Sequence, residues 1–302
     1  MPKTQKIYEA KMLAAFEPPL TLSEPQHWRS GVIFASPHSG RTYPKSFVKR
    51  CDFPLLALRR NEDAFIDKLF APAPALGAPL LAANFPRCIV DVNRAPDELP
   101  SRWLGDNAPA PKRRRAKTIA ARAEAGLGVI PTSLGESVPI YSKPLSVEAA
   151  PARLQALYYP YHEALMELIT AASLRFGGVL LIDCHSMPGF APMGTRRPDI
   201  ILGDCFGQSC HPATLKLLEA AFESRGYQTA RNYPYAGGFV TEHYGKPSSG
   251  IETLQIEINR DLYLNPVTLK PKRGYDELAQ HIEQIIGEVI SARENQALIA
   301  AQ

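Results

Sequence analysis

Residues 179–184 (VLLIDC) form an uninterrupted apolar run that ends directly at His185. Runs of this kind are typical of a strand buried on both faces of a parallel sheet. The preceding residues 154–172 carry apolar side chains at i, i+3, i+4 and i+7 spacing, which predicts an amphipathic helix. Strand and helix patterns alternate in this way along most of the chain. The predicted fold class is therefore α/β, with a mixed, mostly parallel sheet flanked by helices.

The other predicted elements are short, and several strands end at polar residues. Strands are expected at 31–36, 79–84, 88–93, 199–204, 227–232 and 254–259. Helices are expected to start at residue 61, near 211–225 and around 274–293, and a Gly-rich loop is expected at 236–250.

The first 30 residues include Pro18, Pro19 and Pro25 and show no clear periodicity, so we expect an N-terminal arm at 1–30 and a single domain at 31–302. Residues 105–145 are rich in Gly, Pro and basic side chains, and a loop of this length is uncommon unless it is functional. This segment is the place where a lid or a substrate groove is expected.

The charge distribution argues against nucleic acid and membrane partners. The net charge of +4 is small for 302 residues, and the basic run at 112–117 (KRRRAK) is most simply a solvated loop. No apolar run reaches the roughly 18–20 residues of a membrane-spanning helix. An odd count of five cysteines without CxxC spacing, and a start without a signal-peptide pattern, favour a reduced, cytoplasmic location.

Three predicted strands end at chemically capable residues: His38 after 31–36, Asn93 and Arg94 after 88–93, and His185 after 179–184. In open α/β sheets ligands bind beyond the carboxyl ends of the strands, so these side chains are expected to converge. Two histidines with one carboxylate are a recurrent catalytic zinc set. The sequence thus predicts a metal-dependent hydrolase.

The identity of the carboxylate stays open at this point. Asp63 and Glu62 open the helix predicted after His38, while Asp91 and Asp183 lie in predicted strands. Asp183 also stands two residues before His185, where it could accept a hydrogen bond from that imidazole.

Glu257 is unusual because it lies within the apolar alternation of the strand at 254–259. A buried carboxylate needs a partner or a raised pKa, and with a raised pKa it can act as a general base. The alternative is a salt bridge to Arg260. His243 lies in the Gly-rich loop, where it could pack against a substrate.

Five segments together resemble the N-formylglutamate amidohydrolase family. They are SPHSG at 36–40, NEDAFIDKLF at 61–70, VDVNR at 90–94, LLIDCHSMPG at 180–189, and GGFVTEHYGKP with LQIEINRDLY within 237–263. The resemblance runs through most of residues 31–265 in the right order. It implies a zinc-carboxypeptidase-like (phosphorylase/hydrolase-like) fold and one divalent metal ion, Zn²⁺.

The resemblance also implies roles for individual residues. His38, Asp63 and His185 would be metal ligands, with Glu62 still possible in place of Asp63. Glu257 would be the general base. The catalytic Arg94 would hold the substrate carboxylate, and the substrate-binding residues would be Asn93, Arg94 and His243.

The implied reaction is hydrolysis of the amide bond of an N-acyl amino acid, with N-formyl favoured, as in N-formylglutamate. Formate and the free amino acid would be released, which suggests a role in amino-acid degradation. One position departs from the family: an Arg commonly precedes the HYG histidine, and here the residue is Glu242. Two alternatives remain open, a zinc peptidase or amidase on peptide or cell-wall substrates, and a non-catalytic binding protein on the same fold. The oligomeric state is unknown.

Overall fold

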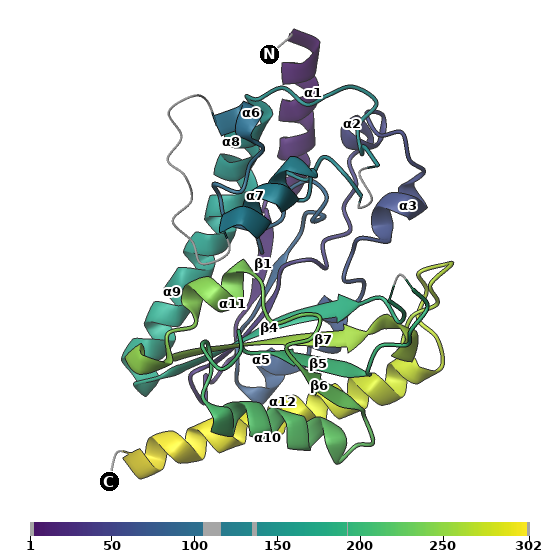
Figure 1. Cartoon of the computed structure of the whole chain (residues 1–302). Coiled ribbons are helices and arrows are strands. Elements are labelled where there is room, and N and C mark those ends of the chain that lie inside the picture. Colours follow the sequence, from purple (N-terminus) through teal and green to yellow (C-terminus); the bar gives the residue numbers. More distant parts are fainter. Residues whose placement is uncertain (1–2, 105–115, 135–137, 192, 301–302) are drawn as a thin grey trace. The chain divides into compact units, whose positions relative to one another are not determined.

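The computed structural model describes residues 3–104, 116–134, 138–191 and 193–300 (Figure 1). The chain divides into two compact units, each built from three separate stretches. The first unit comprises Met1–Leu20, His38–Glu62 and Ala83–Glu163, and the second comprises Thr21–Pro37, Asp63–Ala82 and Ala164–Gln302. The predicted division into an arm and one domain stays a prediction.

The second unit is organised around a sheet that has seven strands within the described residues, in the order β1-β3-β2-β4-β7-β5-β6. The pairs β2–β3, β2–β4, β4–β7 and β5–β6 are parallel, and β5–β7 is antiparallel. This confirms the mixed, mostly parallel α/β sheet. The strands are β1 (Leu20–Ser23), β2 (Val32–Ser36), β3 (Leu80–Ala83), β4 (Val179–Met187), β5 (Ile200–Gly203), β6 (Thr229–Arg231) and β7 (Ile251–Asn259).

The two faces of this sheet have different characters. Helices α10 (Pro212–Glu223) and α12 (Gly274–Ala300) cover one face, and α11 (Phe239–Tyr244) lies on the other (Figure 1). The apolar side chains of β4 and β7, such as Ile182 and Ile256, join the core cluster with residues of α12. Because side chains alternate along a strand, the polar residues between them face the side opposite α10 and α12.

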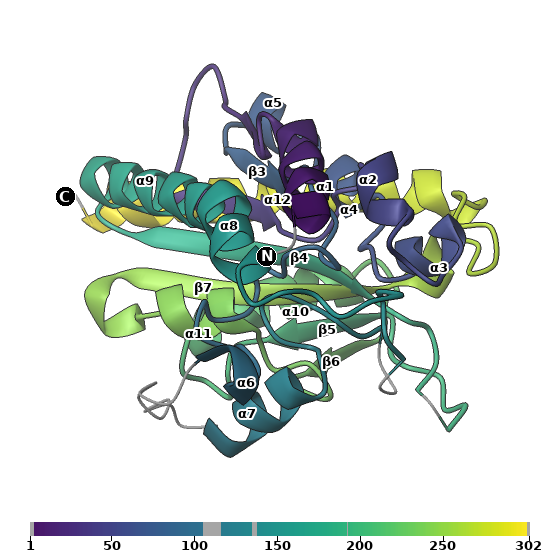
Figure 2. The same ribbon diagram turned by 90° about the horizontal axis from the view of Figure 1, so that it is seen from above.

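Strands β4 and β7 lie side by side in both views (Figure 1, Figure 2). Their register pairs Asp183 with Gln255 and His185 with Glu257. The four side chains therefore share the polar face of the sheet, because paired residues of neighbouring strands point the same way. The short helices α4 (Ile66–Leu69) and α5 (Ala73–Leu76) both contact α12.

The first unit consists mainly of helices and turns. Its helices are α1 (Lys3–Leu13), the 3₁₀ helix Ala14–Phe16, α2 (Lys45–Val48), α3 (Leu55–Arg59), α6 (Ser101–Leu104), α7 (Ala116–Glu124), α8 (Ala149–Arg153) and the π-helix Leu154–Tyr158. The long helix α9 (Tyr159–Phe176) follows directly and confirms the helix predicted at 154–172. Helix α1 and strand β1 show that residues 3–23 hold regular structure that their weak periodicity did not predict.

The strand predicted at 88–93 is wrong, because these residues form successive turns. The Ile89 N–H donates to Pro86 O at 2.9 Å, and the Arg94 N–H donates to Asp91 O at 3.2 Å. Ile89, Val90 and Val92 are nevertheless buried. An apolar run reports burial, and a buried turn segment gives the same pattern as a short strand.

Two further expectations are corrected. The helix predicted from residue 61 is only Ile66–Leu69, because Phe65 has a left-handed backbone (φ 67°) and Asp63 lies in the turn before it. The Gly-rich segment at 236–250 contains α11, flanked by Gly238 and Gly245, so its glycines mark the ends of a helix.

The basic run at 112–117 lies mostly in the gap at 105–115, outside the described residues. The described remainder of 105–145 includes α7. Across the described ranges, no helix combines the length and the apolar character that crossing a bilayer requires.

Candidate active site

His185 lies within β4, which extends three residues beyond the predicted strand. Its Nδ1 is 2.9 Å from Asp63 Oδ2, and its Nε2 is 2.9 Å from Asp183 Oδ2. Burial alone would lower the pKa of His185, but the Asp183 and Asp63 carboxylates outweigh it and raise that pKa well above its usual value. A metal ion binding to this imidazole would therefore have to displace a proton.

Asp63 is oriented by residues near the ends of β4 and β7. Its Oδ1 accepts hydrogen bonds from Arg260 Nη2 at 2.9 Å and from Ser186 Oγ at 3.1 Å. Arg260 Nε also donates to Ser186 Oγ at 2.9 Å. These contacts occupy Oδ1 and direct Oδ2 toward His185.

His38 follows β2 by two residues and is buried. Its Nε2 lies 2.8 Å from Asp91 Oδ1, which also accepts the Asn93 N–H at 2.9 Å. The second oxygen of Asp91 accepts from Arg87 Nη2 at 2.7 Å. Burial would raise the pKa of Asp91, but Arg87 and His38 hold it well below its usual value, so the carboxylate is ionised. With Nε2 engaged in this way, Nδ1 is the nitrogen that His38 would offer to a metal.

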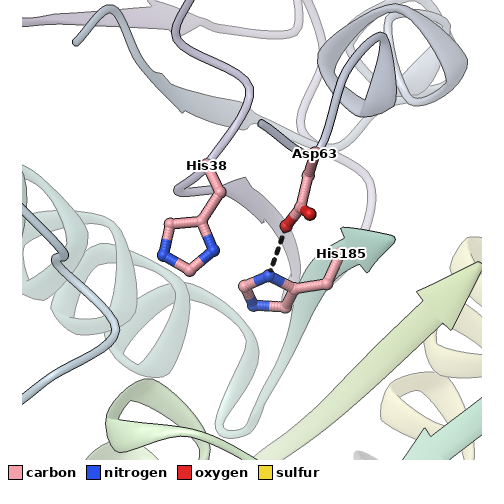
Figure 3. Close-up of side chains that lie close together, drawn as sticks. All are labelled: His38, Asp63 and His185. Atoms are coloured by element: carbon pink, nitrogen blue, oxygen red, sulfur yellow. Dashed lines mark hydrogen bonds and ion pairs between the residues drawn. The ribbon is translucent and has the colours of Figure 1, made fainter. Parts of the chain in front are cut away.

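The structure brings together three of the predicted site residues. One ligand atom each from His38, Asp63 and His185 lies within 4.8 Å of the other two (Figure 3). All three side chains are buried. Two imidazoles and a carboxylate match the donor set of a catalytic zinc site, in which a fourth position stays open. The donors present therefore fit a divalent metal ion.

The other candidate carboxylates have different partners. Glu62 accepts from Arg59 Nε at 3.0 Å and from Arg59 Nη2 at 3.4 Å. Asp91 and Asp183 each contact a nitrogen of one candidate histidine ligand, an arrangement that fixes the orientation of a ligating imidazole. Asp63 is thus the carboxylate that the geometry groups with the two histidines.

Glu257 is buried on β7 and accepts a hydrogen bond from Gln255 Nε2 at 3.0 Å. It pairs in register with His185, which places the expected base on the same face of the sheet as a candidate ligand. Arg260, which sequence reasoning considered as a partner of Glu257, pairs with Asp63 at 2.9 Å.

Arg94 and Asn93 lie beside the Asp91 carboxylate that holds His38. Arg94 Nε is 3.9 Å from Asp91 Oδ2 and 3.7 Å from Glu98 Oε1, and Arg94 Nη1 donates to Asn93 O at 3.1 Å. Burial lowers the pKa of Arg94, and the two carboxylates oppose this effect. Their predicted role in binding a substrate carboxylate stays a prediction.

His243 lies on α11, where it is exposed and stacks on Phe239 with ring centroids 4.7 Å apart. Its substrate-binding role also stays a prediction. Sequence reasoning missed Arg260 and Ser186 as groups that orient Asp63. The signal for both was their position, since Ser186 directly follows His185 and Arg260 lies three residues after Glu257, just past the end of β7.

Comparison with known proteins places this site in context. Residues 30–264 match a family model described as N-formylglutamate amidohydrolase. An N-formylglutamate deformylase of Pseudomonas aeruginosa is 29% identical over 237 residues, which cover 77% of this chain and 81% of that protein. An N-formylglutamate deformylase of Pseudomonas putida is 28% identical over 237 residues, with 77% and 80% covered. A crystal structure of N-formylglutamate amidohydrolase from Ralstonia eutropha aligns with a TM-score of 0.82 and 32% identity, and covers 92% of this chain and 99% of that one.

Proposed function

Because the chain belongs to the N-formylglutamate amidohydrolase family and is a hydrolase of carbon–nitrogen bonds, we propose that its substrate is N-formylglutamate and that it requires a divalent metal, most simply Zn²⁺. The products are formate and glutamate. We assign the reaction to amino-acid degradation in the cytoplasm, with a small N-acyl amino acid as the binding partner.

The observation that carries the metal requirement is the buried group of His38, Asp63 and His185, with Glu257 paired in register with His185. When bound at such a site, a divalent ion supplies Lewis-acid polarisation of the scissile carbonyl. Asp91 and Asp183 hold the two imidazoles, while Arg260 and Ser186 hold Asp63.

Glu257 is the group that moves protons in this proposal. Its carboxylate accepts a proton from the attacking water and delivers it to the leaving nitrogen, so that glutamate departs as a neutral amine. Arg94, with Asn93, binds a substrate carboxylate, and the planar guanidinium allows a two-pronged contact that Lys cannot reproduce.

The test is formate release from N-formylglutamate by the purified protein before chelation, after chelation, and after zinc is restored. We expect activity to disappear and return together with about one metal ion per chain. Equal activity after thorough removal of metal would exclude the metal requirement.

Two neighbouring carboxylates supply a matched pair of variants for the same assay. Asp63→Asn is expected to lose both metal and activity. Glu62→Gln changes a carboxylate that is paired with Arg59, so it is expected to keep both. The opposite result would move the ligand role to Glu62.

Glu242 stands where the family commonly has an Arg, and it is exposed on α11. An acidic side chain in place of a basic one raises the question of which amino-acid side chain the substrate carries. A panel of N-formyl amino acids with acidic, neutral and basic side chains measures this specificity. We expect N-formylglutamate to give the highest kcat/KM, and a neutral substrate that is hydrolysed faster would replace it.

A further inference from the structure

Gln255 is a buried amide on β7, two residues before Glu257 and on the same face of the sheet. Its Oε1 accepts the backbone N–H of Gly238 at 2.9 Å. Its Nε2 donates to Glu257 Oε1 at 3.0 Å. The side chain thus joins a backbone segment to the carboxylate expected to act as the base.

The orientation of this amide is determined by its two partners. A backbone N–H can only donate, so the Gln255 oxygen must face Gly238 and the nitrogen must face Glu257. In the flipped orientation, the Gln255 NH₂ group would face the Gly238 N–H, which is also a donor, and the Gln255 oxygen would face the Glu257 carboxylate, which is also an acceptor. Gln255 therefore presents a donor to the Glu257 carboxylate.

The segment that anchors Gln255, residues 236–238, is itself closely held. The Cys205 N–H donates to Ala236 O at 2.7 Å. Gly237 has φ +132°, and a Cβ added there would lie 2.8 Å from Cys205 Sγ and 2.9 Å from Thr241 Cβ, so the chain passes without room for a side chain. Gly238 then directly precedes α11 as its N-cap residue. The Gly238 N–H that donates to Gln255 Oε1 is thus part of a closely packed backbone segment.

The surroundings explain why Glu257 needs such a donor. Across the strand pair, Gln255 faces Asp183 and Glu257 faces His185, which itself contacts Asp183 and Asp63. This face of the strand pair therefore carries several carboxylates, and like charges repel one another. A neutral donor fixed on one side of Glu257 selects one rotamer without adding another charge.

We propose that Gln255 is a positioning residue for hydrolysis, which fixes the Glu257 carboxylate through a relay anchored at the Gly238 N–H. This inference rests on the proposed role of Glu257 as the base. It assigns Gln255 no contact with the reacting atoms.

The test is a double-mutant cycle on the metal-loaded protein. Gln255→Met keeps the length of the side chain and removes both hydrogen bonds. We expect kcat to fall by about 10–100-fold, since a misplacement of about 1 Å at a catalytic group has effects of that order. KM and metal content are expected to stay close to those of the native protein.

The second arm of the cycle repeats this substitution in a Glu257→Asp background. The aspartate is one methylene shorter and no longer reaches Gln255, so Gln255→Met is expected to change kcat there by less than about 3-fold. An equal loss of kcat in both backgrounds would overturn the proposal. Native activity of Glu257→Asp alone would instead reject Glu257 as the base.

Two further variants guard against a general effect on the fold. Glu252→Gln lies on the same strand and alters contacts with Thr214 and Arg293, so we expect a lower Tm with unchanged kcat. If Gln255→Met does not fold, Gln255→Glu takes its place in the cycle. Gln255→Glu keeps an acceptor for the Gly238 N–H but places a carboxylate against Glu257. We therefore expect the same result as for Gln255→Met: a large fall in kcat in the native background and a small one in the Glu257→Asp background.

Discussion

Each of the two units contains a buried cluster of charged side chains, and the two clusters are used differently. In the first unit, the fully buried Arg153 is paired with Glu9 through Nε, and its Nη1 contacts Ile89 O at 3.1 Å and Tyr141 Oη at 2.8 Å. Arg50 adds a second cation at 2.9 Å from Glu9. Here the polar groups satisfy one another, and the cluster joins α1 to the rest of its unit.

The cluster in the second unit is not balanced in this way. It contains Asp63, Asp183 and Glu257, with Arg260 and His185 as their basic neighbours. If His185 is neutral, as a metal ligand must be, the carboxylates exceed the positive charge. We call the first cluster saturated, because its charged groups are paired with one another and hold parts of the unit together. The second cluster has an excess of acceptors, which suits it to binding a cation.

The largest expected effect that separates the two clusters is on turnover. Glu257→Gln keeps the shape of the side chain but removes the base, so kcat should fall by about 10²–10⁴-fold. The Tm should change little, because glutamine keeps the size of the buried side chain and its oxygen can still accept from Gln255. Formate release and thermal unfolding measure the two quantities, and a loss below about 10-fold would contradict the assignment.

The next largest effect is on stability in the first unit. Arg153→Met leaves Glu9 buried without its main partner and should lower the free energy of unfolding by about 3–5 kcal/mol. Urea titration measures it. The double variant Glu9→Gln, Arg153→Met should recover part of this loss, because no unpaired carboxylate is then buried. A double variant less stable than Arg153→Met would show that the Glu9–Arg153 pair does not cause the loss of stability.

A smaller effect concerns the residues that hold the imidazoles. Asp183→Asn should weaken metal affinity by about 10–100-fold, because the carboxylate that contacts His185 Nε2 is replaced by a neutral amide. Competition with a chromophoric chelator measures it. The control is Asp199→Asn. Asp199 directly precedes β5 and is paired with Arg196, so its replacement should leave metal affinity unchanged.

The smallest effect is a pH dependence in the saturated cluster. Burial would raise the pKa of Glu9, but Arg153 and Arg50 outweigh it and lower that pKa below its ordinary value of 4.5. The resulting stabilisation is complete above pH 4.5 and is lost as the pH falls through the folded-state pKa. Glu9→Gln should therefore flatten the loss of stability in acid, measured by urea titration at a series of pH values. An unchanged acid slope would exclude Glu9 as a contributor.

Most of the strands and the long helices α9 and α12 were predictable because each has a local cause. The apolar run before His185 and the periodicity of residues 154–172 predict β4 and α9, and both are present. Prediction failed where burial and local backbone geometry diverged. Residues 88–93 are mostly apolar and are buried, but they form turns, and Phe65 adopts a left-handed conformation that its residue type does not signal.

The chemistry of the candidate site was visible in the sequence as residue types at the ends of strands. His38 and His185 were selected in this way, whereas Asp63 was one of four candidate carboxylates and stood at the start of a predicted helix, and Glu257 was selected from within an apolar strand. What the sequence could not supply was the pairing of atoms, such as Asp63 with His185 across 122 residues and Asp63 with Arg260 across 197. Contacts of this separation depend on how whole elements pack.

By itself, the sequence determined the alternation of strands and helices along most of the chain, the two histidines, and the set of carboxylates from which a ligand had to come. Only the tertiary structure decided that Asp63 joins the histidines, that Glu62 pairs with Arg59, and that Gln255 links Gly238 to Glu257. The physical reason is that secondary structure follows from neighbours in the chain. The orientation of a buried polar side chain follows from whichever donors and acceptors the packed fold brings within hydrogen-bonding distance.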